Sequence, residues 1–273
     1  MAIELFDTHC HIQSAGIDDG ERLTREVWSK DKTLTAEKIM TAAAANGVKR
    51  LICVGCDLSD SRLAIDFATK YDGVWASIGI HPHEAKDHAD DNDKLAEFSA
   101  LTAQSKVVAI GECGLDYYYE HSPKAEQIKI LRFQIELALT NDLPMIFHVR
   151  DAFNDFWPIF NDYQNIRGVL HSFTDSQANL DKAVAAGLFV GVNGIATFVK
   201  QPEQRAMYQT IPINNLLIET DAPFLTPTPY RGSINEPKQA LTVATFLSEL
   251  YQIDLATLAT ATTANANKLF GLE

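Results

Sequence analysis

Residues 106–114 read KVVAIGECG, an apolar run that ends close to a glutamate, Glu112. Its hydrophobicity is continuous rather than alternating, and the same is true of LICVG at 51–55 and LLIE at 216–219. Strands that are covered on both faces, as in parallel sheets flanked by helices, have this composition. The run at 106–114 therefore predicts a buried strand of an α/β protein.

Further runs of this kind recur along the whole chain. The predicted strands are 3–9, 49–55, 73–80, 106–114, 144–149, 168–172, 188–194 and 216–220. The predicted helices are 35–46, 59–71, 93–105, 123–141, 152–163, 176–186, 203–210, 236–250 and 255–270. Thr35 and Ser59 stand at expected N-cap positions, whereas Gly47 and Gly187 stand where a helix should end in a left-handed residue.

Eight strands that alternate with helices over about 250 residues are typical of a (β/α)8 TIM barrel, here expected as a single domain over residues 1–273. A doubly wound open sheet is the alternative, but no glycine-rich phosphate fingerprint follows the first strand. Two segments depart from the alternation: a polar insertion at 12–32 and a proline-rich loop at 222–235. Both follow strands, on the side of a barrel where active sites are built.

Composition limits the class of protein. The chain has 273 residues, of which 46% are hydrophobic and 22% charged, the balance of a globular protein with a large core. No apolar run approaches the roughly 18 residues of a membrane span, and the start MAIELFD is acidic where a secretory signal would be basic. These features predict a cytoplasmic protein without membrane contact.

The four cysteines are expected to be reduced and buried, because all lie in or beside strand-like segments. Cys53 and Cys56 match C-x-x-C, but residues three apart in a strand point to opposite faces. The formal net charge is −13, which repels polyanions at long range. Any phosphate chemistry therefore needs a local reversal of the charge.

Histidines mark the end of the first predicted strand, in FDTHCHIQ at 6–13. His9 and His11 are two residues apart, share one face of a strand, and could grip one ion together. Considered without the other strands, the two histidines could equally be polar residues that face water at the open end of a barrel. Other strands also end in ionisable residues, namely Glu112, His148, His171 and Asp221. Buried ionisable groups are costly unless paired or bound to metal, so these six predict a metal site at the carboxyl ends of the strands.

Six nitrogen and oxygen ligands suit two divalent ions with a bridging carboxylate, for which Glu112 is the natural choice. His9, His11 and Asp221 would hold one ion, and His148 and His171 the other. Asp221 can also accept the proton of an attacking water, which makes Asp221 and Glu112 the expected catalytic residues. Two dications and two carboxylates leave a local charge of about +2, which can attract phosphate.

The motifs FDTHCHIQ, GIHPHEA, GECGLDYY, FHVRDA, GVLHSFTDS, ETDAPFLTP and NEP together resemble the TatD family of metal-dependent deoxyribonucleases, within the amidohydrolase superfamily. The resemblance covers nearly the whole chain. It implies a TIM barrel, two divalent ions (magnesium, manganese or zinc) held at the six positions above, and hydrolysis of DNA phosphodiesters, often from a 3′ end. Single-stranded DNA or DNA 3′ ends are the partner this implies, for a monomer or weak oligomer.

Four further residues are candidate substrate contacts. By resemblance His81 contacts substrate phosphate, although it could instead support a metal ligand. Arg150 and Arg231 are candidate phosphate clamps, since guanidinium matches phosphate bidentately, with surface salt bridges as the alternative. Tyr117 begins a run of three tyrosines that could stack a base or form part of the core. Many family members have a second arginine where this chain has Ile234, which puts one phosphate contact in doubt.

Two other functions remain open on the sequence. The same metals could hydrolyse a carboxyl ester, a lactone or an amide, including the ester of a mischarged transfer RNA. A barrel that keeps only the fold could serve as a non-catalytic scaffold, although a scaffold has no need of six costly polar residues.

Overall fold

The computed structural model describes residues 3–17 and 22–272. The chain folds into two compact units. Among the described residues, the first comprises 3–17, 22–53, 172–268 and 272, and the second comprises 54–171 and 269–271. The organisation of residues 1–273 as a single domain stays a prediction.

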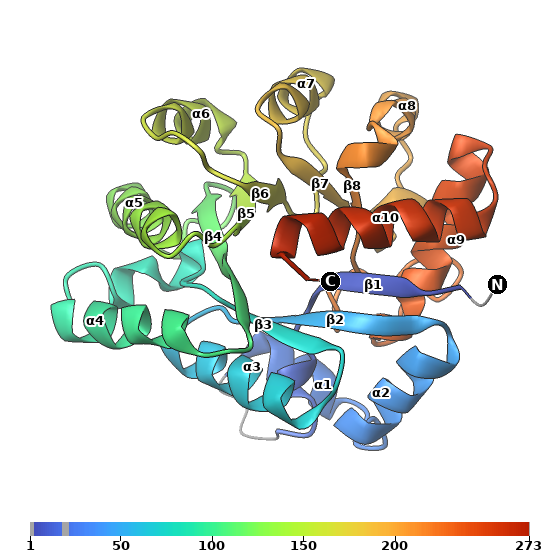
Figure 1. The fold of residues 1–273 in the computed structure, drawn as a ribbon, viewed down its shortest axis with the longest axis horizontal. Helices are drawn as coiled ribbons and strands as arrows, with labels where there is room; N and C mark the ends of the chain where they lie inside the picture. The colour runs from blue at the N-terminus through green and yellow to red at the C-terminus, as the bar shows by residue number, and fades with distance from the viewer. Residues whose placement is uncertain (1–2, 18–21, 273) are drawn as a thin grey trace. The chain divides into compact units, whose positions relative to one another are not determined.

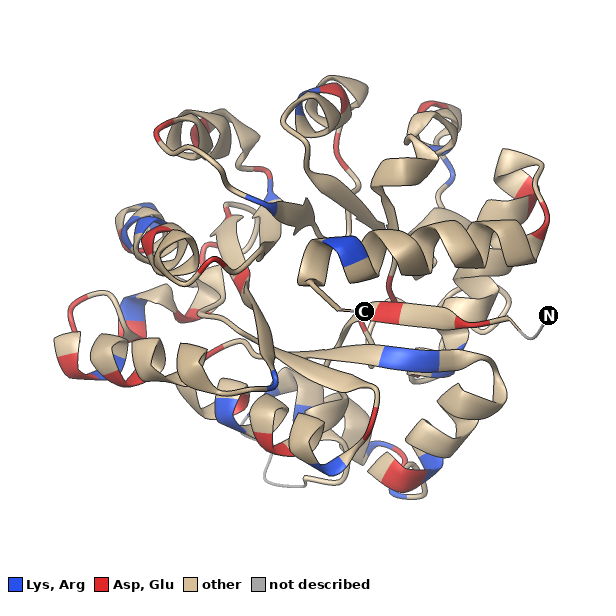
Figure 2. Cartoon of the chain, in the orientation of Figure 1, with Lys and Arg blue, Asp and Glu red and all other residues tan. Residues whose placement is uncertain are grey.

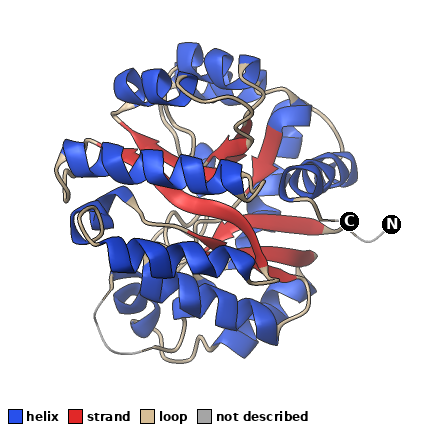
Figure 3. Ribbon diagram, turned by 60° about the vertical axis from the view of Figure 1, so that its left-hand side comes forward, coloured by secondary structure: helices blue, strands red, loops and turns tan. Residues whose placement is uncertain are grey.

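Eight strands alternate with helices along the chain (Figures 1 and 3), and their order in the sheet is the order of the sequence. This is the (β/α)8 fold that the sequence predicts. The strands are β1 (Leu5–Cys10), β2 (Val48–Val54), β3 (Val74–Ile78), β4 (Val107–Asp116), β5 (Met145–Arg150), β6 (Gly168–Leu170), β7 (Phe189–Val192) and β8 (Leu216–Ile218). Each overlaps one of the eight predicted runs.

The described residues form ten α-helices. They are α1 (Leu23–Ser29), α2 (Ala36–Ala45), α3 (Leu58–Lys70), α4 (Asn92–Ala100), α5 (Lys124–Thr140), α6 (Phe153–Asn161), α7 (Gln177–Ala185), α8 (Pro202–Thr210), α9 (Ala240–Tyr251) and α10 (Leu255–Phe270). Figure 2 shows both signs of charge on α4 and α5. Within the described residues, no helix combines the length and the apolar character needed to cross a membrane.

In the first unit, β1 pairs in parallel with β2, and β7 pairs in parallel with β8. A bridge between Cys10 and Ala222 joins the end of β1 to the segment that follows β8. Apolar side chains of these strands are buried, among them Leu5 and Leu217. This pairing brings the end of β1 and the residues after β8, both of which carry predicted ligands, to the same edge of the first unit.

In the second unit, β3, β4, β5 and β6 pair in parallel in that order. The neighbouring strands β4 and β5 approach closely at Gly114, whose φ is +150° and where a Cβ atom would lie 1.8 Å from the carbonyl oxygen of His148. A side chain at position 114 is therefore excluded by sterics. Helix α6 covers this pair with aromatic rings, and the Phe147 and Phe156 centroids are 5.2 Å apart.

Most predicted helix ends are confirmed, with one correction. Thr35 accepts a hydrogen bond from the Lys38 N–H, and Gly47 and Gly187 have φ of +82° and +76°. At α3 the predicted cap Ser59 is wrong: Asp57 caps this helix by accepting from the Asp60 N–H at 2.8 Å.

The polar insertion at 12–32 contains a helix, α1, which the sequence did not predict. Trp28 on this helix is buried, and its indole N–H donates to the His11 carbonyl at 3.1 Å. Part of the insertion, residues 18–21, lies outside the described residues.

Candidate metal centre

Three predicted ligands of the first unit lie close together. His9 and His11, at the end of β1, are buried and have ring centroids 5.1 Å apart. The Asp221 Oδ1 atom lies 3.7 Å from His9 Nε2 and 3.4 Å from His11 Nε2. A carboxylate and two imidazoles at these distances form a donor set suited to a divalent ion.

Backbone hydrogen bonds hold Asp221 against β1. Its N–H donates to the His9 carbonyl, and the His11 N–H donates to the Ala222 carbonyl, both at 2.8 Å. Asp221 has φ of +57°, a left-handed conformation that aspartate tolerates better than most residues. The side chain is therefore directed by a sharp turn immediately after β8.

A buried aspartate on β1, Asp7, stabilises this turn through hydrogen bonds. Asp7 accepts hydrogen bonds from the Thr220 N–H at 2.9 Å and the Thr220 hydroxyl at 2.6 Å. Burial raises the pKa of Asp7 to about 8, although the hydrogen bonds from Thr220 and His9 oppose the rise. Asn235, in the NEP motif, donates to the Thr220 carbonyl at 2.8 Å. The motif thus supports the turn that carries Asp221.

The second unit brings its own predicted ligands around Glu112. The Glu112 Oε1 atom lies 2.8 Å from His148 Nδ1, 3.4 Å from His171 Nε2 and 3.6 Å from His81 Nε2. Ligand atoms of His81, Glu112 and His148 all lie within 4.8 Å of one another, so that one ion could contact all three. His81 is thus placed beside the predicted ligands rather than apart from them.

Asp116, which sequence reasoning missed, anchors two of these histidines. Its Oδ2 atom lies 3.0 Å from His148 Nε2 and 3.1 Å from His83 Nε2. Asp116 follows Glu112 by four residues on β4, and residues an even number apart in a strand share a face. This spacing within GECGLD was the signal that could have identified it.

Burial and the neighbouring charges shift the pKa values of Asp116, His148 and His81. Burial works against ionisation of Asp116, but hydrogen bonds with His148 and His83 lower its pKa well below the ordinary range. Burial works against protonation of His148, but the Asp116 and Glu112 carboxylates raise its pKa to about 9. Burial lowers the pKa of His81 well below its usual value. His81 is therefore neutral and able to act as a ligand or acceptor.

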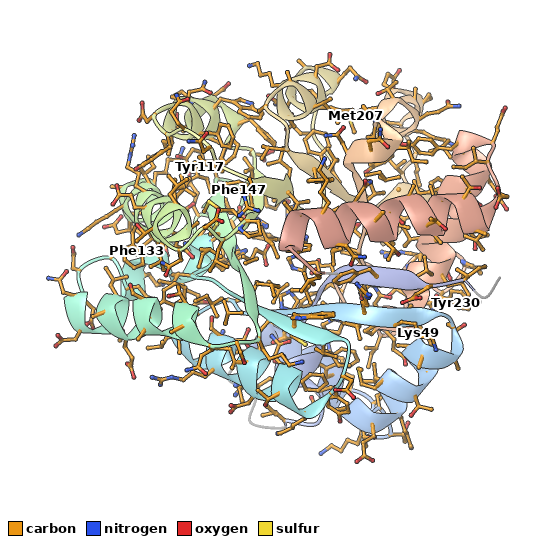
Figure 4. All side chains as sticks on the ribbon, viewed as in Figure 1. Lys49, Tyr117, Phe133, Phe147, Met207 and Tyr230 are labelled. Carbon is orange, nitrogen blue, oxygen red and sulfur yellow. The ribbon has the colours of Figure 1, made fainter. Side chains whose placement is uncertain are left out.

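The candidate substrate residues differ in their surroundings. Tyr117, labelled in Figure 4, donates its hydroxyl hydrogen bond to Asp155 at 2.8 Å, and the Lys124 ammonium lies 4.1 Å from its ring centre. Burial, followed by the Asp155 hydrogen bond, raises the pKa of Tyr117. These contacts tie the Tyr117 ring to α5 and α6 residues, so its role as a base-stacking surface stays a prediction.

The two predicted phosphate clamps are both exposed and both stacked on aromatic rings. The Arg150 guanidinium carbon lies 4.0 Å from the Tyr118 ring centre. The Arg231 guanidinium carbon lies 3.9 Å from the Phe198 ring centre, and the guanidinium donates to the Thr226 carbonyl at 2.8 Å. Arg231 is thus partly engaged in holding its own loop.

Known proteins resemble this chain along its whole length. A family model described as "TatD related DNase" matches residues 6–271. The "Uncharacterized metal-dependent hydrolase YabD" of Bacillus subtilis is 36% identical over 97% of this chain and 98% of its own. The "3'-5' ssDNA/RNA exonuclease TatD" of Cronobacter sakazakii is 34% identical over 93% of this chain and 97% of its own.

A solved structure agrees with these sequence matches. The crystal structure of YJJV, a TatD homologue from Escherichia coli, superposes with a TM-score of 0.86 at 28% identity. It covers 100% of both chains. This chain and YJJV therefore share the fold over their whole lengths.

Proposed function

Because this chain belongs to the family of TatD related DNases, we propose that it is a metal-dependent nuclease that removes nucleotides from the 3′ end of single-stranded DNA. The 34% identical relative named "3'-5' ssDNA/RNA exonuclease TatD" supports this substrate and direction. The observation that carries the proposal is the cluster at Glu112, where imidazole nitrogens of three histidines surround one carboxylate oxygen.

The proposed cofactor is a pair of divalent ions, with magnesium, manganese or zinc as candidates. His9, His11 and Asp221 would hold one ion, His148 and His171 the other, and Glu112 would bridge them. Two features support this assignment: the donor atoms are the imidazole nitrogens and carboxylate oxygens that these metals accept, and the strand ends of a (β/α)8 fold carry its active sites. Bound ions would supply Lewis-acid polarisation of the phosphodiester and a water of lowered pKa.

The chain's own residues have distinct roles in this proposal. Asp221 accepts the proton of the attacking water. Asp116 fixes the imidazole of His148 through Nε2, which leaves Nδ1, on the side of Glu112, as the ligand atom. Such a carboxylate–histidine pair sets the tautomer and orientation of a metal-binding imidazole. His81 and Arg150 are the proposed contacts to substrate phosphate, and the positive charge of Arg150 offsets locally the net charge of −13.

Digestion of 3′-labelled single strands by purified protein, with and without a chelator, tests the proposal. Metal-dependent shortening from the labelled end is expected, together with stoichiometric divalent metal in gently purified protein. Glu112→Gln should abolish the shortening, whereas Glu97→Gln, which changes an exposed carboxylate paired with Arg62 on α3, should leave it intact.

A parallel panel of carboxyl esters, lactones and aminoacyl-tRNA separates the nuclease from the other hydrolytic function. Turnover of a carboxyl ester without turnover of DNA would replace the proposed substrate but keep the metal chemistry. Absence of bound metal and of any turnover would contradict both and favour a scaffold.

A further inference from the structure

Two adjacent tyrosines are exposed next to the Glu112 cluster. Tyr118 is 58% exposed and Tyr119 is 51% exposed, and they make up half of the four large apolar side chains that stand out into solvent among the described residues. The His121 ring lies parallel to that of Tyr119, with an interplanar angle of 4° and centroids 5.6 Å apart. Together with Arg150, these three rings form a surface that we call the aromatic platform.

The cation of the platform is the Arg150 guanidinium, whose N–H groups can donate hydrogen bonds to a ligand. The Arg150 guanidinium lies 4.0 Å from the Tyr118 ring centre and 4.8 Å from that of Tyr119. Within residues 3–17 and 22–272, no carboxylate forms an ion pair with it. A guanidinium stacked on aromatic rings keeps its N–H groups in its own plane, where they can donate to a phosphate.

Although its rings are exposed, the platform is held firmly by its backbone. The N–H groups of Tyr118 and Tyr119 donate to Asp116 Oδ1 at 3.0 and 2.9 Å. The other oxygen of the same carboxylate contacts His148 and His83. Asp116 therefore fixes the platform and one predicted metal ligand at once.

Ring contacts also connect the platform to the cluster. The His83 centroid is 5.6 Å from that of Tyr119 and 4.3 Å from that of His81, which in turn is 4.6 Å from that of His148. A chain that reaches the Glu112 cluster with its terminal phosphodiester can thus place neighbouring bases on the platform.

We propose that the aromatic platform binds unpaired nucleobases of a single-stranded nucleic acid, with Arg150 contacting an adjacent phosphate. This inference rests on the proposed nuclease function and adds the surface that selects single strands. Bases of a duplex are stacked on one another, whereas unpaired bases can stack on exposed rings, and such stacking is tolerant of sequence. The cation offsets, at this surface, the acidic charge of the chain.

The test measures each tyrosine variant on two substrates, one that carries bases at its 3′ end and one that lacks them. The two substrates are 3′-labelled single strands, one with normal nucleotides and one with abasic residues at the last positions. The variants are Tyr118→Ala, Tyr119→Ala and a matched control, Tyr163→Ala. Tyr163 also packs with an arginine, Arg132, but this arginine is paired with Asp162.

On the normal strand, kcat/KM should fall about tenfold in each platform variant, mainly through KM, which is the size expected for loss of one stacked base. On the abasic strand, the platform variants should lose much less, because the stacking base is gone and only the support of the Arg150 guanidinium by the ring is removed. Tyr163→Ala should match wild type on both strands. An equal loss of kcat/KM on both strands, or no loss on either, would contradict the proposal that the platform binds bases.

A binding measurement distinguishes failure of the nuclease proposal from failure of the platform proposal. If wild-type protein shortens neither strand, affinity for the same two strands, measured by fluorescence anisotropy, tests the platform directly. Weaker binding of the abasic strand by wild type, and no such difference in Tyr118→Ala, would keep the platform. Equal binding of both strands by wild type would reject it.

Discussion

The Nε2 atom of His148 lies 3.0 Å from Oδ2 of Asp116, a carboxylate on the neighbouring strand β4. The other ring nitrogen of His148 lies 2.8 Å from Glu112 on that same strand. The imidazole is thus held at both nitrogens. In the proposed metal site its orientation as a ligand would depend on Asp116, which need not touch the metal or the substrate, and we therefore expect Asp116 to act as a positioning residue.

Asp116→Asn should lower activity about 10- to 100-fold, because loss of the carboxylate behind a metal-binding histidine weakens both orientation and basicity. The affinity for manganese, measured by titration calorimetry, should weaken in parallel, whereas a purely structural role would reduce thermal stability and leave affinity per folded molecule unchanged. Asp155→Asn, which removes the partner of Tyr117 instead, is the control and should bind manganese like wild type.

Glu112→Gln should remove metal-induced stabilisation. A ligand that binds only the folded state raises stability by RT ln(1 + [L]/Kd), about 2.7 kcal/mol at a hundredfold excess over Kd. Wild type should therefore show a clear rise in melting temperature when manganese is added after chelation, and Glu112→Gln a much smaller one. An equal rise in both proteins would show that Glu112 is not a ligand.

The strands and the strand-end residues were accessible from sequence because both follow from periodicity. Continuous apolar runs predict buried parallel strands, and Glu112, His148 and His171 are predicted ligands because each stands at the end of such a run. The sequence does not single out Asp116, because the predicted strand stops at Gly114, two residues short of the observed end of β4. Helix α1 was missed because its seven residues show too little periodicity to stand out from a polar segment.

The sequence predicts less well which side chains are exposed and which hydrogen-bond partners they have. Three consecutive tyrosines look alike in sequence, but Tyr117 is tied to Asp155 and Lys124 while Tyr118 and Tyr119 stand in solvent. The sequence predicts Ser59 rather than Asp57 as the cap of α3, because both residue types are good caps and only the hydrogen bond from the Asp60 N–H distinguishes them. Such distinctions arise from packing that local sequence does not encode.

Gly114→Ala should destabilise the second unit by roughly 3 kcal/mol or more, since a Cβ atom would meet backbone rather than a flexible side chain. Its nearest contact would be the His148 carbonyl oxygen, so β5 would have to shift at a predicted metal ligand. Gly232→Ala is the matched control: its φ is also positive, at +93°, but no atom lies within 4 Å of the added Cβ. It should lose only about 1–2 kcal/mol, the cost of a left-handed side chain. Urea denaturation of the three proteins measures both losses, and equal losses would show that backbone conformation, not the clash, limits position 114.

The free energy of unfolding should decline at alkaline pH because of Tyr251, a partly buried tyrosine that is distant in sequence from the candidate metal ligands. Tyr251, the last residue of α9, donates its hydroxyl hydrogen to the carbonyl oxygens of Tyr208 and Ile211, at 2.9 and 2.6 Å. Burial raises the pKa of Tyr251 above its ordinary value of about 10. The folded chain therefore keeps this proton at a pH where the unfolded chain has lost it. The contribution of Tyr251 is complete below pH 10 and declines as the pH rises above that value.

Tyr251→Phe should be about 1–2 kcal/mol less stable than wild type at pH 8, because two carbonyl groups lose their donor. The difference should narrow as the pH rises from 9.5 to 11, since only wild type must keep this phenol protonated to remain folded. Denaturant titrations at each pH measure it. Tyr230→Phe, at a half-exposed tyrosine, should keep a constant difference from wild type. A Tyr251→Phe deficit that stays constant to pH 11 would mean that the phenol ionises as readily in the folded chain as in the unfolded one.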